Sequence, residues 1–202
     1  VALAILFLTL CLSCAVNKVE DAKDATKIGG LDAALQIPSA GGSAFHSEGL
    51  AYWSAWTTDG AAPVQADSAF LTRGLRCSGR YCDDVSLLFA ESGYQQTNSW
   101  WTSSFSEESP NEKICENNGF VTGLSCSGSY CDNVALRCSQ LNNNNVRKNC
   151  YWTGNISEES GGKFVAPQSS YAAGARCSGR YCDNMQLYMC QADPGDVVFD
   201  TA

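Results

Sequence analysis

The sequence Cys-Ser-Gly-x-Tyr-Cys-Asp occurs three times in this chain, and this repetition constrains the fold more than any other feature. The copies begin at Cys77, Cys126 and Cys177, so they are spaced by 126 − 77 = 49 and 177 − 126 = 51 residues. A nearly constant period of this length is typical of a structural unit that is repeated in space. Any function of the chain is therefore expected in a feature that is present three times.

The residues around each copy of the motif predict β-strands. After each copy, every second residue is apolar or cysteine: Val85, Leu87 and Phe89; Val134, Leu136 and Cys138; Met185, Leu187 and Met189. Alternation with a period of two, in short segments bounded by Gly, Ser and Asn, is the pattern of a strand with one buried face. A tryptophan that we expect in the core (Trp53, Trp101 or Trp152) stands 24 or 25 residues before each motif. Each repeat is thus predicted to form an aromatic strand, a loop and a hairpin whose turn is the motif.

Three such units predict an all-β domain with pseudo-threefold symmetry. The expected architecture is a β-prism, with a β-trefoil as the alternative, built from three disulfide-stapled repeats of about 50 residues. The predicted divisions are a linker or pro-segment at 16–50, the domain at 51–193 with repeats at about 51–95, 96–145 and 146–193, and a C-terminal tail at 194–202.

Residues 1–15 are uncharged and almost wholly apolar. This stretch is too short to span a bilayer, but it fits the apolar region of a secretory signal peptide. Because neither an initiator Met nor a basic segment precedes it, we expect a fragment at this end. The protein is predicted to be secreted and extracellular. Lipid anchoring through Cys14 is the alternative, which Cys11 and Leu12 disfavour because they fit poorly before an acylated cysteine.

Ten of the twelve cysteines lie outside residues 1–15, and this even number indicates disulfides formed in an oxidising compartment. Cysteines at i and i+5 around a four-residue turn face each other across two strands, which predicts Cys77–Cys82, Cys126–Cys131 and Cys177–Cys182. The remaining four cysteines allow three connectivities. Bonds within a repeat favour Cys115–Cys138 and Cys150–Cys190, whereas Cys138–Cys150 with Cys115–Cys190 remains open.

Charge and composition argue against several classes of function. The formal charge of −8 disfavours binding to nucleic acid or to an anionic membrane surface. The only histidine is His46, outside the repeats, so no nucleophile–base set, metal site or cofactor motif can be assembled within them. The acidic pairs Glu107-Glu108 and Glu158-Glu159 are expected to be solvated turn charges. Since threefold repetition is typical of binding sites rather than of catalytic sites, the chain is predicted not to be an enzyme and to need no cofactor or metal.

Within each motif, the order Gly-x-Tyr-x-Asp suits a carbohydrate. Glycine permits a tight turn and leaves room for a ligand to approach the backbone. Tyr and Asp, two positions apart in extended chain, point to the same side. The carboxylate can accept hydrogen bonds from sugar hydroxyls while the ring packs against sugar C–H groups. The predicted carbohydrate-binding residues are Gly79, Tyr81, Asp83, Gly128, Tyr130, Asp132, Gly179, Tyr181 and Asp183.

The segment from Val121 to Asp132 resembles the binding hairpin of the jacalin-related β-prism lectins, most of all their triple-site, griffithsin-type members. Those proteins carry a Gly-x-Tyr-x-Asp or Gly-x-x-x-Asp turn after a strand of the form x-Val-x-Gly-Leu/Phe. Partial matches occur at 71–83 and 172–183, and the likeness covers about twenty residues of each repeat. The resemblance implies that each Tyr and Asp contacts mannose or a related hexose. The chain departs from the family in its motif cysteines and in lacking a Gly-Gly loop in every repeat.

These observations predict a secreted, multivalent carbohydrate-binding protein, a lectin or adhesin, whose partners are glycans or glycoproteins. One alternative is a structural extracellular repeat protein that self-assembles into a coat or fibre through its strand edges, with the motif serving only to staple a turn. Another alternative is the binding module of a toxin or secreted hydrolase.

Overall fold

The computed structural model describes residues 49–193, except for Ser109 and residues 143–144. The predicted signal peptide (1–15), the alternative lipid site at Cys14, nearly all of the predicted linker (16–50) and the predicted tail (194–202) lie outside the described residues. The described chain is all-β, which confirms the predicted fold class. No helix of the described residues is long and apolar enough to cross a membrane.

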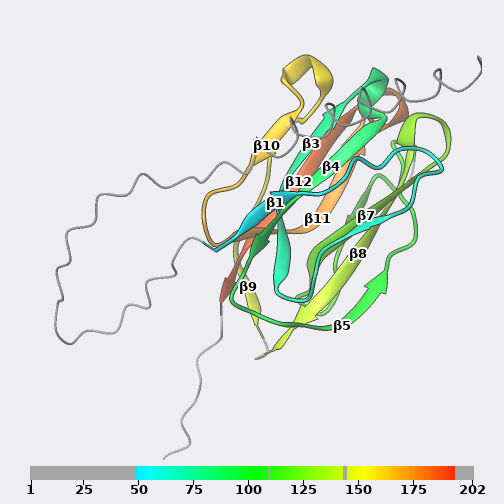
Figure 1. Cartoon of the computed structure of the whole chain (residues 1–202). Helices are drawn as coiled ribbons and strands as arrows, with labels where there is room; N and C mark the ends of the chain where they lie inside the picture. Colours follow the sequence, from blue (N-terminus) through cyan, green and yellow to red (C-terminus); the bar gives the residue numbers. More distant parts are fainter. Residues whose placement is uncertain (1–48, 109, 143–144, 194–202) are drawn as a thin grey trace, which may run out of the picture. The chain divides into compact units, whose positions relative to one another are not determined.

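The strands form three antiparallel sheets of four strands each (Figure 1). Their orders are β1-β4-β3-β10, β2-β7-β8-β5 and β6-β11-β12-β9, which we call sheets A, B and C. The strands are β1 (Ala51–Trp53), β2 (Val64–Gln65), β3 (Phe70–Ser78), β4 (Asp84–Glu91), β5 (Gln96–Trp101), β6 (Glu112–Ile114), β7 (Phe120–Ser127), β8 (Asn133–Leu141), β9 (Val146–Trp152), β10 (Lys163–Val165), β11 (Ser170–Ser178) and β12 (Asn184–Asp193).

Each sheet is built around one long hairpin: β3–β4, β7–β8 or β11–β12. The motif forms the turn of each hairpin, as predicted. The tryptophan-bearing strands β1, β5 and β9 pair with the second strand of the hairpin in their own repeat. Each sheet therefore contains the aromatic strand and the hairpin that the sequence pattern predicts.

The fourth strand of each sheet comes from a different repeat. Strand β2 of the first repeat pairs with β7 of the second, and β6 of the second pairs with β11 of the third. Strand β10 of the third repeat pairs with β3 of the first. Every sheet is thus completed by a strand from another repeat, and the last repeat closes onto the first.

Three glycines make room for these added strands. Gly74, Gly123 and Gly174 occupy the same place in β3, β7 and β11, three residues before the first motif cysteine. A Cβ atom at these positions would lie 2.5–2.6 Å from a backbone carbonyl oxygen of the neighbouring β10, β2 or β6. Because a side chain would block this approach, the glycine before each motif is explained by pairing between repeats.

The core lies between the three sheets. All nine residues of the alternating runs after the motifs are at most 1% exposed, which confirms the predicted burial pattern. Leu75, Leu124 and Ala175 join them from the first strand of each hairpin. Fully burying a side chain such as Leu or Met contributes about 1.5–3 kcal/mol, so this apolar interior is a major source of stability.

The described residues form five disulfides: Cys77–Cys82, Cys126–Cys131, Cys177–Cys182, Cys115–Cys138 and Cys150–Cys190. The first three close the motif turns, and the last two are the bonds within a repeat that the sequence favours. The alternative pairing of Cys138 with Cys150 is excluded. Each motif disulfide thus joins the end of the first strand of its hairpin to the 3₁₀ turn that follows.

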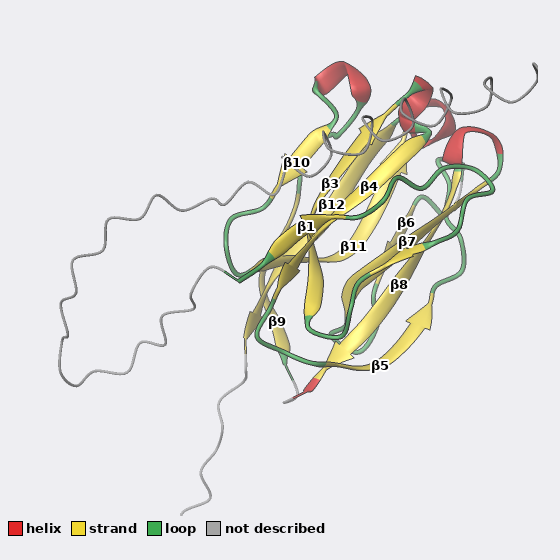
Figure 2. Cartoon of the chain, viewed as in Figure 1, coloured by secondary structure: helices red, strands yellow, loops and turns green. Residues whose placement is uncertain are grey.

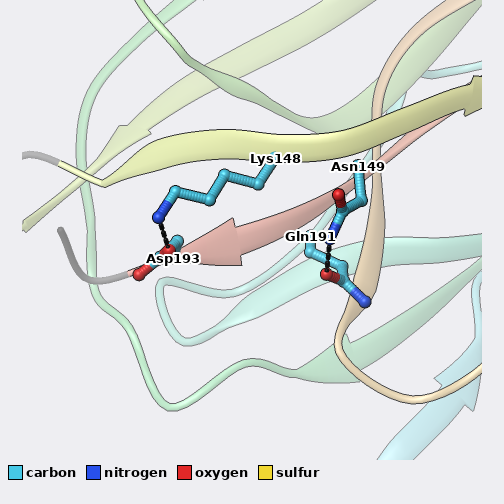
Figure 3. Close-up of polar contacts among 4 residues, drawn as sticks. All are labelled: Lys148, Asn149, Gln191 and Asp193. Atoms are coloured by element: carbon cyan, nitrogen blue, oxygen red, sulfur yellow. Dashed lines mark hydrogen bonds and ion pairs between the residues drawn. The ribbon is translucent and has the colours of Figure 1, made fainter.

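The Cys150–Cys190 bond lies at an irregular place where β9 pairs with β12. The register shifts between Met189 and Gln191, and Asn149 has a positive φ of 50°. The Asn149 side chain donates a hydrogen bond of 2.7 Å to Gln191 Oε1, and Lys148 forms an ion pair with Asp193 (Figure 3). These two contacts connect the edge strand β9 to β12 beside the bulge.

Candidate functional site

The three motif turns meet at one end of the hairpins. Each contains a single 3₁₀ turn, namely η2 (Arg80–Cys82), η3 (Ser129–Cys131) or η6 (Arg180–Cys182), and each of the three contacts the other two. Figure 2 shows short helical segments gathered at the same end of the long strands. The cyclic arrangement of the sheets therefore places the candidate residues of all three repeats side by side.

Tyr81, Tyr130 and Tyr181 form the centre of this end, which we call the tyrosine cluster. Their ring centroids are separated by 5.4, 5.3 and 5.2 Å, in edge-on and tilted orientations. Such distances are typical of favourable aromatic pairs. The sequence pattern predicted one tyrosine for each turn, but it held no signal that the three rings would touch.

The backbone of each turn adopts conformations that side chains disfavour. The φ angles of the three tyrosines are 61°, 58° and 58°, and those of the following cysteines are 55°, 60° and 58°. The motif glycines combine φ of 75–78° with ψ near 180°, a region that is essentially restricted to glycine. Non-glycine residues in the left-handed region cost on the order of 1–3 kcal/mol each, and such residues cluster at functional sites.

The motif aspartates fold back onto their own turns. A Cβ atom added to Gly79, Gly128 or Gly179 would collide with Oδ1 of the aspartate four residues later. Oδ1 of Asp132 accepts a hydrogen bond of 2.6 Å from Asn133. Oδ1 of Asp183 accepts one of 2.5 Å from Asn184. In both turns, one oxygen of the half-buried carboxylate therefore lies against the motif glycine and is hydrogen-bonded to the following asparagine.

The first turn differs because Asp84 replaces the asparagine. Oδ1 of Asp83 is buried without a hydrogen-bond partner. Burial raises the pKa of Asp83, the charge of Asp84 raises it further, and hydrogen bonds from the backbone of both residues act in the opposite direction. The aspartate of the first turn thus lacks a hydrogen bond that the aspartates of the other two turns have.

Two arginines cover part of the tyrosine cluster. The guanidinium carbons of Arg80 and Arg180 each lie 4.9 Å from the ring centroid of the following tyrosine. Their nitrogens also donate to the tyrosine hydroxyls at 3.1 and 3.3 Å. Ser129 stands at the equivalent position of the second motif, and Tyr130 is the most open ring, at 37% exposure. An arginine at the variable position of Gly-x-Tyr thus covers part of the following ring, whereas the serine before Tyr130 leaves that ring more open.

The acidic pairs were expected to be solvated, and that expectation is wrong for one residue of each pair. Glu158 Oε1 accepts a hydrogen bond of 2.9 Å from the backbone N–H of Tyr81. Glu107 Oε1 accepts one of the same length from the N–H of Tyr181. The other members, Glu108 and Glu159, are exposed. Each of these hydrogen bonds joins two repeats, and each holds a half-buried glutamate against the motif turn of the other repeat.

The aligned tryptophans were expected in the core, and this expectation is also wrong. Trp101 is 41% exposed, and Trp53 and Trp152 are only partly buried. Trp53 and Trp152 lie under Arg76 and Arg176 at 4.6 and 4.4 Å. Cation–π stacking on the outside of the sheets accounts for their position.

Within the described residues, no group of three or more His, Cys, Asp or Glu side chains is arranged to hold a metal ion. The candidate site is the tyrosine cluster together with the adjoining motif aspartates Asp83, Asp132 and Asp183, because the three turns meet there. No protein-family model, curated protein or solved structure matches this chain.

Proposed function

We propose that this protein is a secreted, multivalent carbohydrate-binding protein whose binding surface is the end that carries the tyrosine cluster. The single observation that carries this proposal is the meeting of three Gly-x-Tyr-x-Asp turns, with ring centroids 5.2–5.4 Å apart. Strained backbone at all six tyrosine and cysteine positions supports a functional rather than an incidental arrangement.

The chemistry of this surface suits a sugar. Aromatic rings offer apolar faces to sugar C–H groups, and carboxylate oxygens that are not used inside the turns accept hydrogen bonds from hydroxyls. Tyr130 is the most accessible ring and is the expected primary contact, with Asp132 beside it. Because the turns adjoin one another, a branched glycan can contact more than one of them and gain from their effective concentration.

The proposed architecture is a β-prism rather than a β-trefoil. Three sheets of four strands, each centred on one hairpin and completed by a strand from another repeat, support it. Five disulfides support an extracellular location.

A glycan array compared between the wild type and Tyr130→Ala tests the proposal. Tyr151→Ala is the matched control, since Tyr151 is 41% exposed on β9. We expect wild-type binding to hexose-containing glycans, a loss of about tenfold or more for Tyr130→Ala, and no change for the control. An array without bound glycans, or equal binding by both variants, contradicts the proposal.

A second candidate, a structural extracellular repeat protein, is favoured by the motif aspartates, which fold back against the glycines of their own turns. In that case the motif acts as a staple, and the unpaired edges of the sheets mediate assembly. Asp132→Asn, which keeps the shape of the side chain, then lowers the melting temperature without any glycan binding to lose. Electron microscopy of the native protein shows filaments or layers if this candidate is correct.

A further inference from the structure

A second cluster of charged and aromatic side chains lies on the outer face of sheet A, separate from the tyrosine cluster. Arg76 contacts two tryptophans, with its guanidinium carbon 4.6 Å from the Trp53 ring centroid and 4.5 Å from that of Trp56. Lys163 Nζ lies 5.4 Å from the Trp53 ring. Both cations thus gather around the same indole.

The two cations are direct neighbours across the sheet. Lys163 of β10 is the backbone partner of Arg76 on β3. Like charges directly opposite each other on paired strands are destabilising. Neither residue forms an ion pair with a carboxylate of the described chain, although the protein carries a net charge of −8.

Among the described contacts, the terminal nitrogens of Arg76 form no hydrogen bond or ion pair. The indoles of Trp53 and Trp56 contact the guanidinium, and its Nε donates to the buried hydroxyl of Ser86 at 3.3 Å. The terminal nitrogens therefore remain to bind an oxyanion in the planar, two-point manner that suits arginine. Trp56 is 44% exposed and provides an apolar surface for the group that carries the anion.

Sheet C has a similar arrangement, in which a carboxylate residue stands across from the arginine. Arg176 stacks on Trp152 at 4.4 Å, and its Nε donates to Gln186. Its partner across the sheet is Glu112, at the place that Lys163 occupies in sheet A. Sheet A thus has a second cation where sheet C has a carboxylate.

We propose that Arg76 and Lys163 form a binding site for a sulfate or carboxylate group, with Trp56 packing against the ring to which that group is attached. The anion supplies the negative charge that Glu112 places across from Arg176 in sheet C. The site does not depend on the tyrosine cluster, so it goes beyond the proposed function and can hold while that function fails.

Titration of the full-length protein with a heparin-derived hexasaccharide tests this site. We expect tryptophan fluorescence to change on binding, because Trp53 and Trp56 contact the arginine. A desulfated hexasaccharide that retains its carboxylates distinguishes the two anions. Binding of the sulfated form alone assigns sulfate, and equal binding of both assigns carboxylate.

Two charge-matched variants separate a site from bulk attraction. Lys163→Glu recreates the arrangement of sheet C, and we expect it to weaken binding by about tenfold or more, since it also introduces repulsion. Lys113→Glu on β6 changes the net charge equally, and we expect less than about a twofold effect. If both variants weaken binding equally, or if the wild type does not bind either oligosaccharide, the proposal is overturned. Lys163→Gln, which only removes the charge, replaces Lys163→Glu if the latter does not fold.

Discussion

Glu158 reaches from the third repeat to the first, where its Oε1 accepts a hydrogen bond of 2.9 Å from the backbone N–H of Tyr81, 77 residues earlier in the chain. Glu107 does the same for Tyr181, from the second repeat to the third. These carboxylates satisfy backbone donors in turns where tyrosine has a positive φ. Contacts between repeats therefore stabilise the strained turns in addition to the disulfides.

Removing one of these carboxylates should lower stability. For Glu158→Ala we expect the free energy of unfolding to fall by about 1–2 kcal/mol, because a hydrogen bond to a charged acceptor is lost from a partly exposed site. Urea unfolding monitored by tryptophan fluorescence measures the change. Glu159→Ala is the control, since Glu159 is exposed beside it. Equal losses for the two variants would show that the hydrogen bond contributes nothing.

In the second turn, the hydrogen bond from a glutamate can be added instead of removed. Asp59 stands two residues after Thr57, as Glu107 and Glu158 stand two residues after Phe105 and Ile156 in the equivalent bridges. Among the described contacts, no side chain accepts a hydrogen bond from the N–H of Tyr130. Aspartate is one methylene shorter than glutamate. We expect the longer side chain of Asp59→Glu to accept a hydrogen bond from the N–H of Tyr130. This bond should raise the free energy of unfolding by about 1 kcal/mol.

Thermal unfolding of Asp59→Glu, alone and combined with Tyr130→Ala, checks this expectation. The N–H of residue 130 is present in both backgrounds, so the gain should persist when the ring is removed. A gain that vanishes with the ring would indicate a contact with the phenol instead of the backbone.

The Asp83–Asp84 pair predicts a dependence of stability on pH. Burial, together with the charge of Asp84, raises the pKa of Asp83 in the folded protein. The folded state then binds this proton more tightly than the unfolded state, so the associated stability is present below the unfolded pKa of about 4 and is lost as pH rises through the folded value. Asp84→Asn supplies the amide donor that the other two turns have, and we expect about 1 kcal/mol of added stability at pH 7.

Urea unfolding between pH 3 and pH 8 measures this effect. The gain from Asp84→Asn should shrink toward pH 3, where Asp83 is protonated in both proteins. Asn133→Asp is the reciprocal variant and should lower stability at neutral pH. If both variants shift stability equally at every pH, the carboxyl pair is not the cause.

Features set by local sequence were predicted from the sequence, because periodicity and turn chemistry act over a few residues. The burial of Val85, Leu87 and Phe89 follows from their alternation, and the Cys77–Cys82 bond follows from the reach of two cysteines across a hairpin. The glycine of each motif was likewise assigned to a turn for its backbone freedom. The structure adds that the aspartate occupies the space of the missing side chain.

Contacts between repeats were not predicted, because no local pattern encodes them. The meeting of Tyr81, Tyr130 and Tyr181 depends on how the three hairpins are arranged around the core. The assignment of Glu158 to solvent failed because its partner lies 77 residues away. Trp53 was placed in the core by its aromatic character, whereas the nearby Arg76 makes an exposed position favourable.

The pairing of β10 with β3 has a consequence for stoichiometry. Every repeat gives one short strand to another repeat and receives one, and in this chain the ring of exchanged strands closes with three repeats. A chain reduced to one repeat would need to trimerise to recover these pairings. A chain of two repeats would leave one hairpin without its added strand and would be prone to exchange strands with a neighbouring molecule.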